Sequence, residues 1–334
     1  MKAISDETTD SPLSDWDESV CPAQDPDRTE SVLTLEVLSE HAGMRLDKFL
    51  SEQARGFTRS YLQKLIKDHM VLLNGKSCKA SEKLSSGDVI RLSIPEAAEL
   101  EVLPEDIPLD ILYEDQDVVI INKPKGMVVH PGAGHYTGTV VNALLYHCKG
   151  ELSGINGVLR PGIVHRIDQN TTGSLVICKN DTAHKSLAEQ LKNHTITRRY
   201  RAIVHGRLTE DGVIHTTIGR HPVKRREMAV NAPNGKNAVT HYHVLETFDQ
   251  FTYVECVLET GRTHQIRVHM KSIGHPILGD DVYGPSRCPF SGLQGQTLHA
   301  MTLGFIHPAT EQYVEFEAPL PDYFKELLRK LRRE

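Results

Sequence analysis

The chain has 334 residues, of which 39% are hydrophobic and 25% are charged, and its formal net charge at pH 7 is −6. This length suits two domains and a tail, and the hydrophobic content is enough for sizeable cores. The sequence contains no run of about 18 apolar residues, so it predicts no membrane-spanning helix. Six cysteines lack any paired spacing, and the acidic N-terminus has no export or organelle signal, so we expect a cytoplasmic protein with reduced thiols.

The charge is distributed unevenly along the chain. Residues 1–30 hold nine acidic and two basic residues, a balance of −7, whereas residues 160–271 hold seventeen basic and ten acidic residues, a balance of +7. A local basic field attracts a polyanion even when the whole chain is acidic. The sequence therefore predicts a nucleic-acid partner for the basic segment. The acidic composition and few large apolar residues predict a disordered tail over residues 1–31.

Residues 43–94 are expected to form a small α+β module. Apolar residues at helical spacing predict one helix around Leu46 and a second after Thr58, and apolar runs around an Asn-Gly turn at 74–75 predict short strands. The basic residues that we expect to contact RNA from this module include Arg45, Lys48, Arg59 and Lys64. The pattern resembles the alpha-L RNA-binding motif of a small-subunit ribosomal protein and many RNA-modifying enzymes. The alternative is an ordinary small domain with solvated lysines.

The remaining chain is predicted to be a linker followed by one larger domain. Residues 95–108 combine three prolines with five acidic residues, which is typical of an extended inter-domain linker. Residues 109–334 alternate strand-like and helical stretches, which predicts a mixed α+β domain. The predicted strands are 118–122, 175–179, 200–204, 239–245 and 253–258, and the predicted helices are 140–147, 183–192, 263–273 and 323–332.

The segment from His165 to Gly173 carries the strongest chemical signal. It places one acid, Asp168, beside Arg166 in a turn-forming stretch between two apolar runs. Loops held by a sheet are where chemistry usually occurs. Taken alone, however, the segment is more typical of a tight turn in which Asp168 serves only backbone groups.

Further segments complete a constellation that resembles the RluA family of ribosomal large-subunit pseudouridine synthases. The resemblance covers nearly everything after about Gly43. The segments that carry it are 122–126, 160–166, 198–206, 261–269 and 274–280. Segments 219–222 and 236–242 look most like the RluD branch of the family. One departure is mild: Ile167 and Gln169 stand where the family more often has leucine and lysine.

The resemblance implies a pseudouridine synthase domain with a bent, largely antiparallel sheet and a central cleft. It makes Asp168 the essential carboxylate, acting at the sugar as nucleophile or as base. Arg267, on a helix that begins near Thr263, is expected to face Asp168 and keep it ionised. Tyr200 is expected to stack on the uracil and transfer a proton. The alternative for Tyr200 is a strand tyrosine half in the core.

Other basic residues are assigned to RNA contacts. Arg166 is expected to fill the space that a flipped uridine vacates, as its counterpart in the family is thought to do. A basic hairpin or loop with Arg225 and Arg226 is expected to grip phosphates. His165 and Lys123, which lie in segments that carry the resemblance, are included among the predicted RNA contacts. For any single basic residue, a solvated surface position is the alternative.

Other chemistries fit the sequence less well. The glycines of 132–138 lack the βαβ unit of a dinucleotide site. Aspartic proteases and glycosidases need two carboxylates at the reacting bond, whereas this chain offers one acid surrounded by bases. The eighteen histidines include no three at a familiar metal-binding spacing. We therefore predict neither a metal nor a cofactor.

The function predicted from these patterns is site-specific isomerisation of uridine to pseudouridine in large-subunit ribosomal RNA. We expect a monomeric cytoplasmic enzyme that acts on this RNA or on a pre-ribosomal particle, without a membrane association. The alternative is a non-catalytic RNA-binding factor for ribosome assembly on the same scaffold. The joint presence of Asp168, Tyr200 and Arg267 favours the enzyme.

Overall fold

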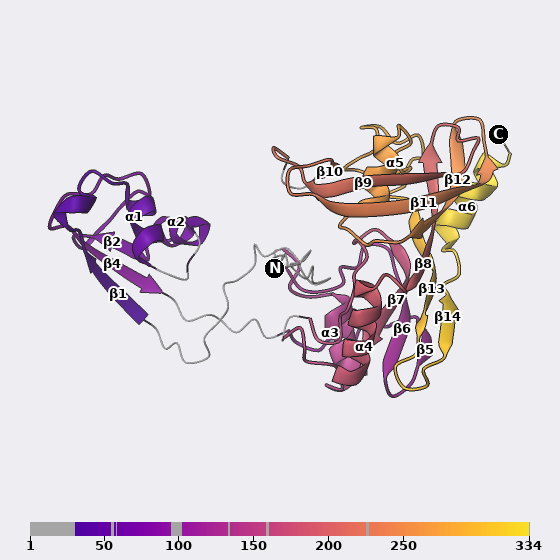
Figure 1. Cartoon of the computed structure of the whole chain (residues 1–334), viewed down its shortest axis with the longest axis horizontal. Coiled ribbons are helices and arrows are strands. Elements are labelled where there is room, and N and C mark those ends of the chain that lie inside the picture. Colours follow the sequence, from indigo (N-terminus) through magenta and orange to yellow (C-terminus); the bar gives the residue numbers. More distant parts are fainter. Residues whose placement is uncertain are drawn as a thin grey trace, which may run out of the picture. The chain divides into compact units, whose positions relative to one another are not determined.

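The computed structural model describes residues 31–54, 57, 59–94, 102–132, 134–157, 160–224 and 227–333. These residues fall into two compact units, one ending at residue 94 and the other beginning at residue 102 (Figure 1). Nearly all of the predicted acidic tail lies outside the described residues, as does the first half of the predicted linker.

The N-terminal unit packs two helices on a four-stranded antiparallel sheet. Its elements are β1 (Ser31–Glu36), a 3-10 turn (Ser39–His41), α1 (Leu46–Gln53), α2 (Arg59–Lys67), β2 (Val71–Leu73), β3 (Lys76–Ser77) and β4 (Val89–Ile94), in the sheet order β1-β4-β2-β3. Leu46 and Leu62 bury one face of each helix in a common core, as their helical spacing predicts. β1 was not predicted, so the unit begins at Ser31 rather than near residue 43.

The second unit is built on one ten-stranded sheet. Its strands are β5 (Ile111–Glu114), β6 (Val118–Lys123), β7 (Thr172–Cys178), β8 (Thr197–His205), β9 (Gly212–Arg220), β10 (Met228–Val230), β11 (Lys236–Thr247), β12 (Phe251–Leu258), β13 (Leu298–Ile306) and β14 (Tyr313–Glu317). They follow the order β10-β9-β11-β12-β8-β13-β7-β6-β5, with β14 paired to β13. Among these strands only β13 and β7 pair in parallel.

The sheet is bent, as Figure 1 shows: β9 to β12 cross its upper part, β5 to β7 form its lower part, and β8 and β13 run between them. Four helices pack on it: α3 (Val140–His147), α4 (Asp181–Lys192), α5 (Gln265–Ser272) and α6 (Asp322–Leu331). All four lie where the sequence predicts helices, to within two residues at each end. The predicted class, a mixed α+β domain with a largely antiparallel bent sheet, is confirmed.

β7 is buried along its whole length. Leu175 and Ile177 lie in the core cluster that includes α3, whereas Val176 and Cys178 lie in the cluster that includes α4. A strand covered on both faces needs no polar alternation, which is why this stretch reads as a continuous apolar run. β7 therefore gives the loop that precedes it a rigid support.

The predicted linker is shorter than 95–108. The amide of Glu105 donates to the backbone carbonyl of Asn142 at 3.0 Å, and the Asn142 side chain donates to the carbonyl of Leu103 at 2.8 Å. The Glu105 carboxylate also accepts a hydrogen bond from the amide of Gly138 at 3.0 Å. Residues from 102 onward thus belong to the second unit. Within the described parts of the chain, no helix is long and apolar enough to cross a membrane.

Candidate active site

Asp168 lies in the loop that leads into β7. Its backbone carbonyl accepts a hydrogen bond from the amide of Thr171 at 3.0 Å, which closes a tight turn. Gly173 follows with φ of +107°, and a Cβ at this position would overlap the backbone of Ala300 on β13. Because only glycine satisfies both demands, the turn that carries Asp168 can lie directly against β13.

Lys123, at the end of β6, anchors this loop from inside the protein. Its side chain is 0% exposed, and its ammonium donates hydrogen bonds to the carbonyls of Pro124 (2.8 Å), Met127 (2.8 Å) and Gln169 (3.0 Å). Burial lowers the pKa of Lys123 to about 7, and the charge of Asp168 acts in the opposite direction. All three ammonium protons are directed at the protein backbone. The prediction that Lys123 contacts RNA is therefore corrected: its side chain supports the loop.

Two neighbouring loops hold the turn in place. The amide of Gly126 donates to the carbonyl of Gln169 at 2.9 Å, and the Gln169 side chain donates back to the carbonyl of Gly126 at 3.1 Å. Gln296 donates to the hydroxyl of Thr171 at 3.0 Å. Gln169 thus has a defined contact here, although the resembling family more often has lysine at this position.

Arg267, on α5, joins two carboxylates. Its Nη1 donates to Oδ2 of Asp168 at 2.9 Å, while its Nε and Nη2 donate to Oδ2 and Oδ1 of Asp280 at 2.7 and 2.9 Å. Arg267 is 4% exposed and Asp280 is 2% exposed. The two-point contact with Asp280 fixes the plane of the guanidinium, so Asp168 is reached from a set direction. The structure brings Arg267 and Asp168 together as the sequence predicts.

The charges around Asp168 favour its ionised form. Burial by itself raises the pKa of the Asp168 carboxyl, but Arg267 and Arg166, joined by His264 when its ring is protonated, hold that pKa below its usual value. Burial also disfavours the charge on Arg267, yet Asp280 and Asp168 raise the pKa of the guanidinium. Asp168 therefore stays a carboxylate at neutral pH, which both a nucleophile and a base at the sugar require.

His264 and Tyr283 complete the surroundings of Asp168. Nε2 of His264 lies 3.8 Å from Oδ1 of Asp168, and its Nδ1 lies 2.8 Å from the Tyr283 hydroxyl. The Tyr283 ring lies below Arg267, with 5.1 Å between the guanidinium carbon and the ring centre. Sequence reasoning assigned no role to His264, Tyr283 or Asp280. The sequence could have pointed to these three residues because they lie in or beside segments 261–269 and 274–280, which carry the family resemblance.

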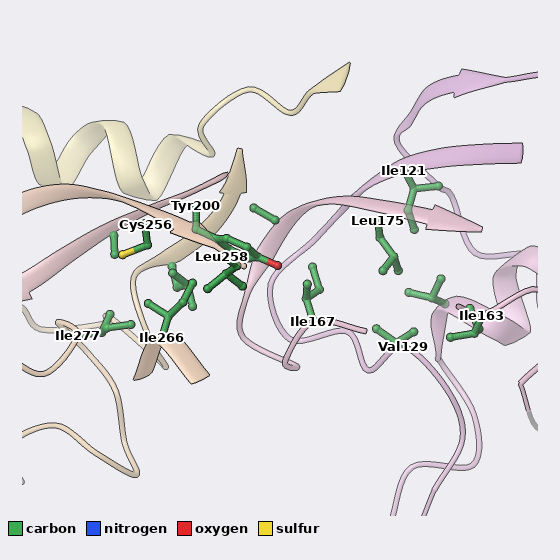
Figure 2. Packing of buried hydrophobic residues seen from close by; sticks show 14 of the residues in the cluster. Ile121, Val129, Ile163, Ile167, Leu175, Tyr200, Cys256, Leu258, Ile266 and Ile277 are labelled. Carbon is green, nitrogen blue, oxygen red and sulfur yellow. The ribbon is translucent and has the colours of Figure 1, made fainter. Parts of the chain in front are cut away.

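Tyr200 lies in β8 and is 8% exposed. Figure 2 shows its hydroxyl pointing toward the loop that carries Ile167, the residue before Asp168. Burial raises the pKa of the Tyr200 phenol; Arg198 opposes this change and Asp168 adds to it. The hydroxyl therefore keeps its proton at neutral pH. The ring packs in the core, as the alternative interpretation expected of a strand tyrosine, and the role of Tyr200 in stacking and proton transfer stays a prediction.

Arg166 and His165 differ sharply although they are adjacent. Arg166 is exposed and has no hydrogen bond or ion pair with any residue that the structure describes. Its charge still contributes to lowering the pKa of Asp168. His165 instead accepts a hydrogen bond from the amide of Val176 at 3.1 Å through Nε2, and burial together with Arg198 lowers its pKa to about 3. Arg166 thus suits an RNA contact, whereas the neutral His165 ring supports β7.

The other predicted RNA contacts lie in the N-terminal unit or between β9 and β10. In the N-terminal unit, Lys64 is exposed, Lys48 lies 3.8 Å from Glu52, and Arg45 donates to the buried Asp47 at 3.1 Å. Arg45 is therefore partly committed to an internal ion pair. The side chain of Arg59, in α2, lies outside the described residues, as do Arg225 and Arg226 between β9 and β10.

Within the described ranges, Asp115, Asp117 and His307 form the one group of three side chains with metal-ligand character. Nδ1 of His307 accepts the amides of Ala309 and Thr310 at 3.3 Å, so Nε2 carries the proton and donates to Asp115 at 2.8 Å. The other Asp115 oxygen accepts two backbone amides. The hydrogen bonds of His307 and Asp115 are those of a closed turn.

Comparisons with known proteins agree for both units. The model of a family described as RNA pseudouridylate synthase matches residues 117–272, and the model of the S4 domain matches residues 44–90. "Uncharacterized RNA pseudouridine synthase YlyB" of Bacillus subtilis is 55% identical, over 88% of this chain and 96% of that protein. "Ribosomal large subunit pseudouridine synthase D" of Escherichia coli is 44% identical, over 90% of this chain and 94% of that protein.

Solved structures show the same fold. "Human RNA Pseudouridylate Synthase Domain Containing 1" is similar with a TM-score of 0.52 and 26% identity, over 72% of this chain and 98% of that chain. "Human RNA Pseudouridylate Synthase Domain Containing 4" is similar with a TM-score of 0.52 and 28% identity, over 66% of this chain and 92% of that chain. The matched segment 117–272 includes Asp168, Tyr200 and Arg267.

Proposed function

The chain belongs to the RluA family of RNA pseudouridine synthases, and from this premise we propose that it isomerises uridine at defined sites of large-subunit ribosomal RNA. The observation that carries the proposal is the contact between Asp168 and Arg267, with Asp280 holding the same guanidinium. The RNA substrate is inferred from similar proteins whose names specify the ribosomal large subunit, and from the S4 match.

Asp168 is the group that acts on the sugar. It does so as a nucleophile at C1′ or as a base on the ribose, and each role needs the ionised carboxylate that Arg267 favours. The bond between C1′ and N1 breaks, the uracil turns while it stays bound, and a bond between C1′ and C5 forms. N1 gains a proton and C5 loses one, so the atoms balance without a metal, a redox partner or a group donor.

Tyr200 and Arg166 act on the uridine base and on the RNA strand that the uridine leaves. The Tyr200 hydroxyl, which points toward the Asp168 loop, takes part in the proton transfer at C5, and its ring packs against the uracil. A uridine must leave its stack before the reaction, because the sugar is otherwise out of reach. Arg166 is exposed beside Asp168 and occupies the vacated position in the RNA. The exposed Arg166 thus contacts the opened RNA strand, whereas the buried Tyr200 takes part in the chemical step.

The competing function is a non-catalytic RNA-binding factor for ribosome assembly. The experiment that separates the two maps pseudouridine in large-subunit rRNA from cells that lack the protein and from cells complemented with wild type, Asp168→Asn or Tyr200→Phe. We expect specific sites to lose pseudouridine in the deletion, to regain it fully with wild type and only slightly with Tyr200→Phe, and not to regain it with Asp168→Asn. If Asp168→Asn restores the modification, the enzyme proposal is wrong. In vitro, prolonged chelator treatment is expected to leave the wild-type rate unchanged.

A further inference from the structure

Two hydrogen-bond donors face the two oxygens of the Asp168 carboxylate. Arg267 Nη1 donates to Oδ2 at 2.9 Å, and His264 Nε2 lies 3.8 Å from Oδ1. We propose that His264 is a positioning residue that holds Oδ1 of Asp168 toward the ribose of the bound uridine, in a tautomer that Tyr283 fixes. The proposal rests on the function proposed above and adds a residue to it.

The hydrogen bonds around Tyr283 decide which nitrogen of His264 carries the proton. The Tyr283 hydroxyl accepts a hydrogen bond from the amide of Met228 at 2.7 Å and lies 2.8 Å from His264 Nδ1. Its own proton then has one acceptor among the described residues, which is Nδ1. A neutral imidazole that accepts at Nδ1 must be protonated at Nε2. The Nε2 proton is therefore directed at the carboxylate, where an unprotonated nitrogen would repel it.

One short segment supports both donors. Oδ1 of Asp280 accepts the amides of Val282 and Tyr283 at 3.0 Å, and the same carboxylate holds Arg267. The Tyr283 ring is 3% exposed and makes an edge contact with the His264 ring as well as lying below Arg267. The segment from Asp280 to Tyr283 thus orients both side chains that approach Asp168.

The backbone of His264 is in an uncommon conformation. Its φ is 56° and its ψ is 20°, in the left-handed region that non-glycine residues seldom occupy. It precedes α5, but its side chain makes no capping hydrogen bond to the helix and is turned to Tyr283 and Asp168 instead. Such strain persists where the surroundings enforce it, often at functional sites.

The distance of 3.8 Å is longer than a hydrogen bond. Contacts in active sites without substrate are often long and shorten when the substrate complex forms. Oδ2 is already held by Arg267, so the free oxygen Oδ1 is the one whose direction His264 determines. The proposal therefore predicts an effect on the chemical step and little effect on RNA affinity.

The first test compares two substitutions of His264. Glutamine places an amide donor near the position of Nε2, whereas asparagine tolerates the left-handed backbone but withdraws the donor. With a large-subunit rRNA transcript labelled with [5-³H]uridine, we expect His264→Asn to slow single-turnover tritium release about 10- to 100-fold at saturating RNA, because small misplacements of a reacting group have costs of this size. His264→Gln should recover most of the rate. Melting temperatures serve as the folding control.

The second test is a double-mutant cycle with Tyr283→Phe. This substitution removes the hydroxyl and leaves the Met228 amide unpaired, both in the wild-type background and in His264→Gln. Only the wild-type background contains an imidazole whose tautomer depends on that hydroxyl. We expect Tyr283→Phe to slow turnover more in the wild-type background than in His264→Gln. Equal fold-changes in the two backgrounds, or a folded His264→Asn variant with the wild-type rate, would overturn the proposal.

The tautomer has a readout that does not depend on activity. Long-range ¹H–¹⁵N spectra of the full-length protein with ¹⁵N-labelled histidine identify His264 by the signal that His264→Asn removes. We expect protonated Nε2 in wild type and mixed tautomers in Tyr283→Phe; protonated Nδ1 in wild type contradicts the proposal. If the wild-type spectrum shows protonated Nε2 but wild type does not modify the transcript, the proposed RNA substrate is wrong. The proposed positioning by His264 is not contradicted by that result.

Discussion

At the scale of single residues, Arg267 divides one guanidinium between two carboxylates. Nε and Nη2 bind Asp280 and leave Nη1 for Asp168. A lysine ammonium is a point donor without a planar fork, so it cannot reproduce both contacts. The electrostatic support of Asp168 and its direction therefore depend on the same side chain.

We expect Arg267→Lys to slow single-turnover isomerisation by about 10²-fold or more, the usual loss when one oriented electrostatic contact is removed. The pH profile should change as well. The pKa of Asp168 lies below its usual value, so the acid limb of the wild-type rate profile should lie below the pH at which an unperturbed aspartate titrates. In Arg267→Lys this acid limb should move to higher pH. A rate and profile equal to wild type would assign Arg267 a different role.

Lys123 gives a second prediction, because its three hydrogen bonds end on backbone carbonyls. Lys123→Met should lower the free energy of unfolding by about 2–5 kcal/mol, since the buried carbonyls lose their partner. The matched control is Arg166→Met, an exposed cation in the same site, which should leave unfolding nearly unchanged. Urea denaturation of both variants checks this. A stable Lys123→Met variant with weakened RNA binding would restore the original prediction of an RNA contact.

The sequence predicted that Arg267 faces Asp168, and the structure shows this contact, because both residues stand in motifs with a known order. The catalytic roles of Asp168, Arg267 and Tyr200 stay predictions. The sequence did not predict Asp280 or His264 as neighbours of Asp168, since such contacts arise only when distant loops fold together. Lys123 was misassigned for a related reason: a motif shows that a cation is present, but not whether its charge faces solvent or backbone carbonyls.

At the scale of elements, the parallel contact of β7 and β13 positions the Asp168 loop. This contact is short, since only Thr172 and Gly173 pair with His299 and Ala300. The hydroxyl of Thr172 also lies 2.8 Å from Nδ1 of His299. The approach of the two backbones at Gly173 thus determines where the preceding turn can lie.

Gly173→Ala should therefore destabilise the protein by about 3 kcal/mol or more and slow catalysis, because the methyl group forces β7 away from β13 in addition to straining φ. The control is Gly126→Ala, where φ is +86° but a Cβ meets no atom within 4 Å. That change should cost only the backbone strain, about 1–2 kcal/mol. Thermal unfolding distinguishes them, and equal losses would show that packing at Ala300 is unimportant.

The helices were predicted closely, whereas several strands were missed. Amphipathic helices repeat a local pattern, and β6 and β7 contain the apolar runs 118–121 and 175–178. β13 contains His299 and Gly304, which interrupt its apolar pattern, and β1 has only half-buried leucines. Such strands are defined by partners far along the chain, so a local pattern reveals them poorly.

At the scale of the whole molecule, the chain has two units, one that contains the S4 match and one that contains the pseudouridylate synthase match, each with its own hydrophobic core. The groups around Asp168 all belong to the second unit. Exposed basic side chains such as Lys48 and Lys64 belong to the first. This division suggests that substrate affinity and chemistry are separable.

Removing residues 1–94 should therefore weaken RNA binding more than it slows the single-turnover rate at saturating RNA. The logarithm of the binding constant should also fall less steeply with the logarithm of salt concentration, because fewer phosphates are contacted. Filter binding over a series of salt concentrations measures both. Unchanged affinity and salt dependence would mean that the N-terminal unit does not bind the substrate.

The most direct measurement of the central claim compares wild type and Asp168→Asn on one large-subunit rRNA transcript, with pseudouridine formation and the RNA dissociation constant determined for each. Asparagine keeps the shape of Asp168 and loses its charge, so we predict equal affinity, an equal melting temperature and no product. Turnover by Asp168→Asn at a rate near that of wild type would contradict the account, because the reaction would then not depend on the carboxylate that Arg267 holds.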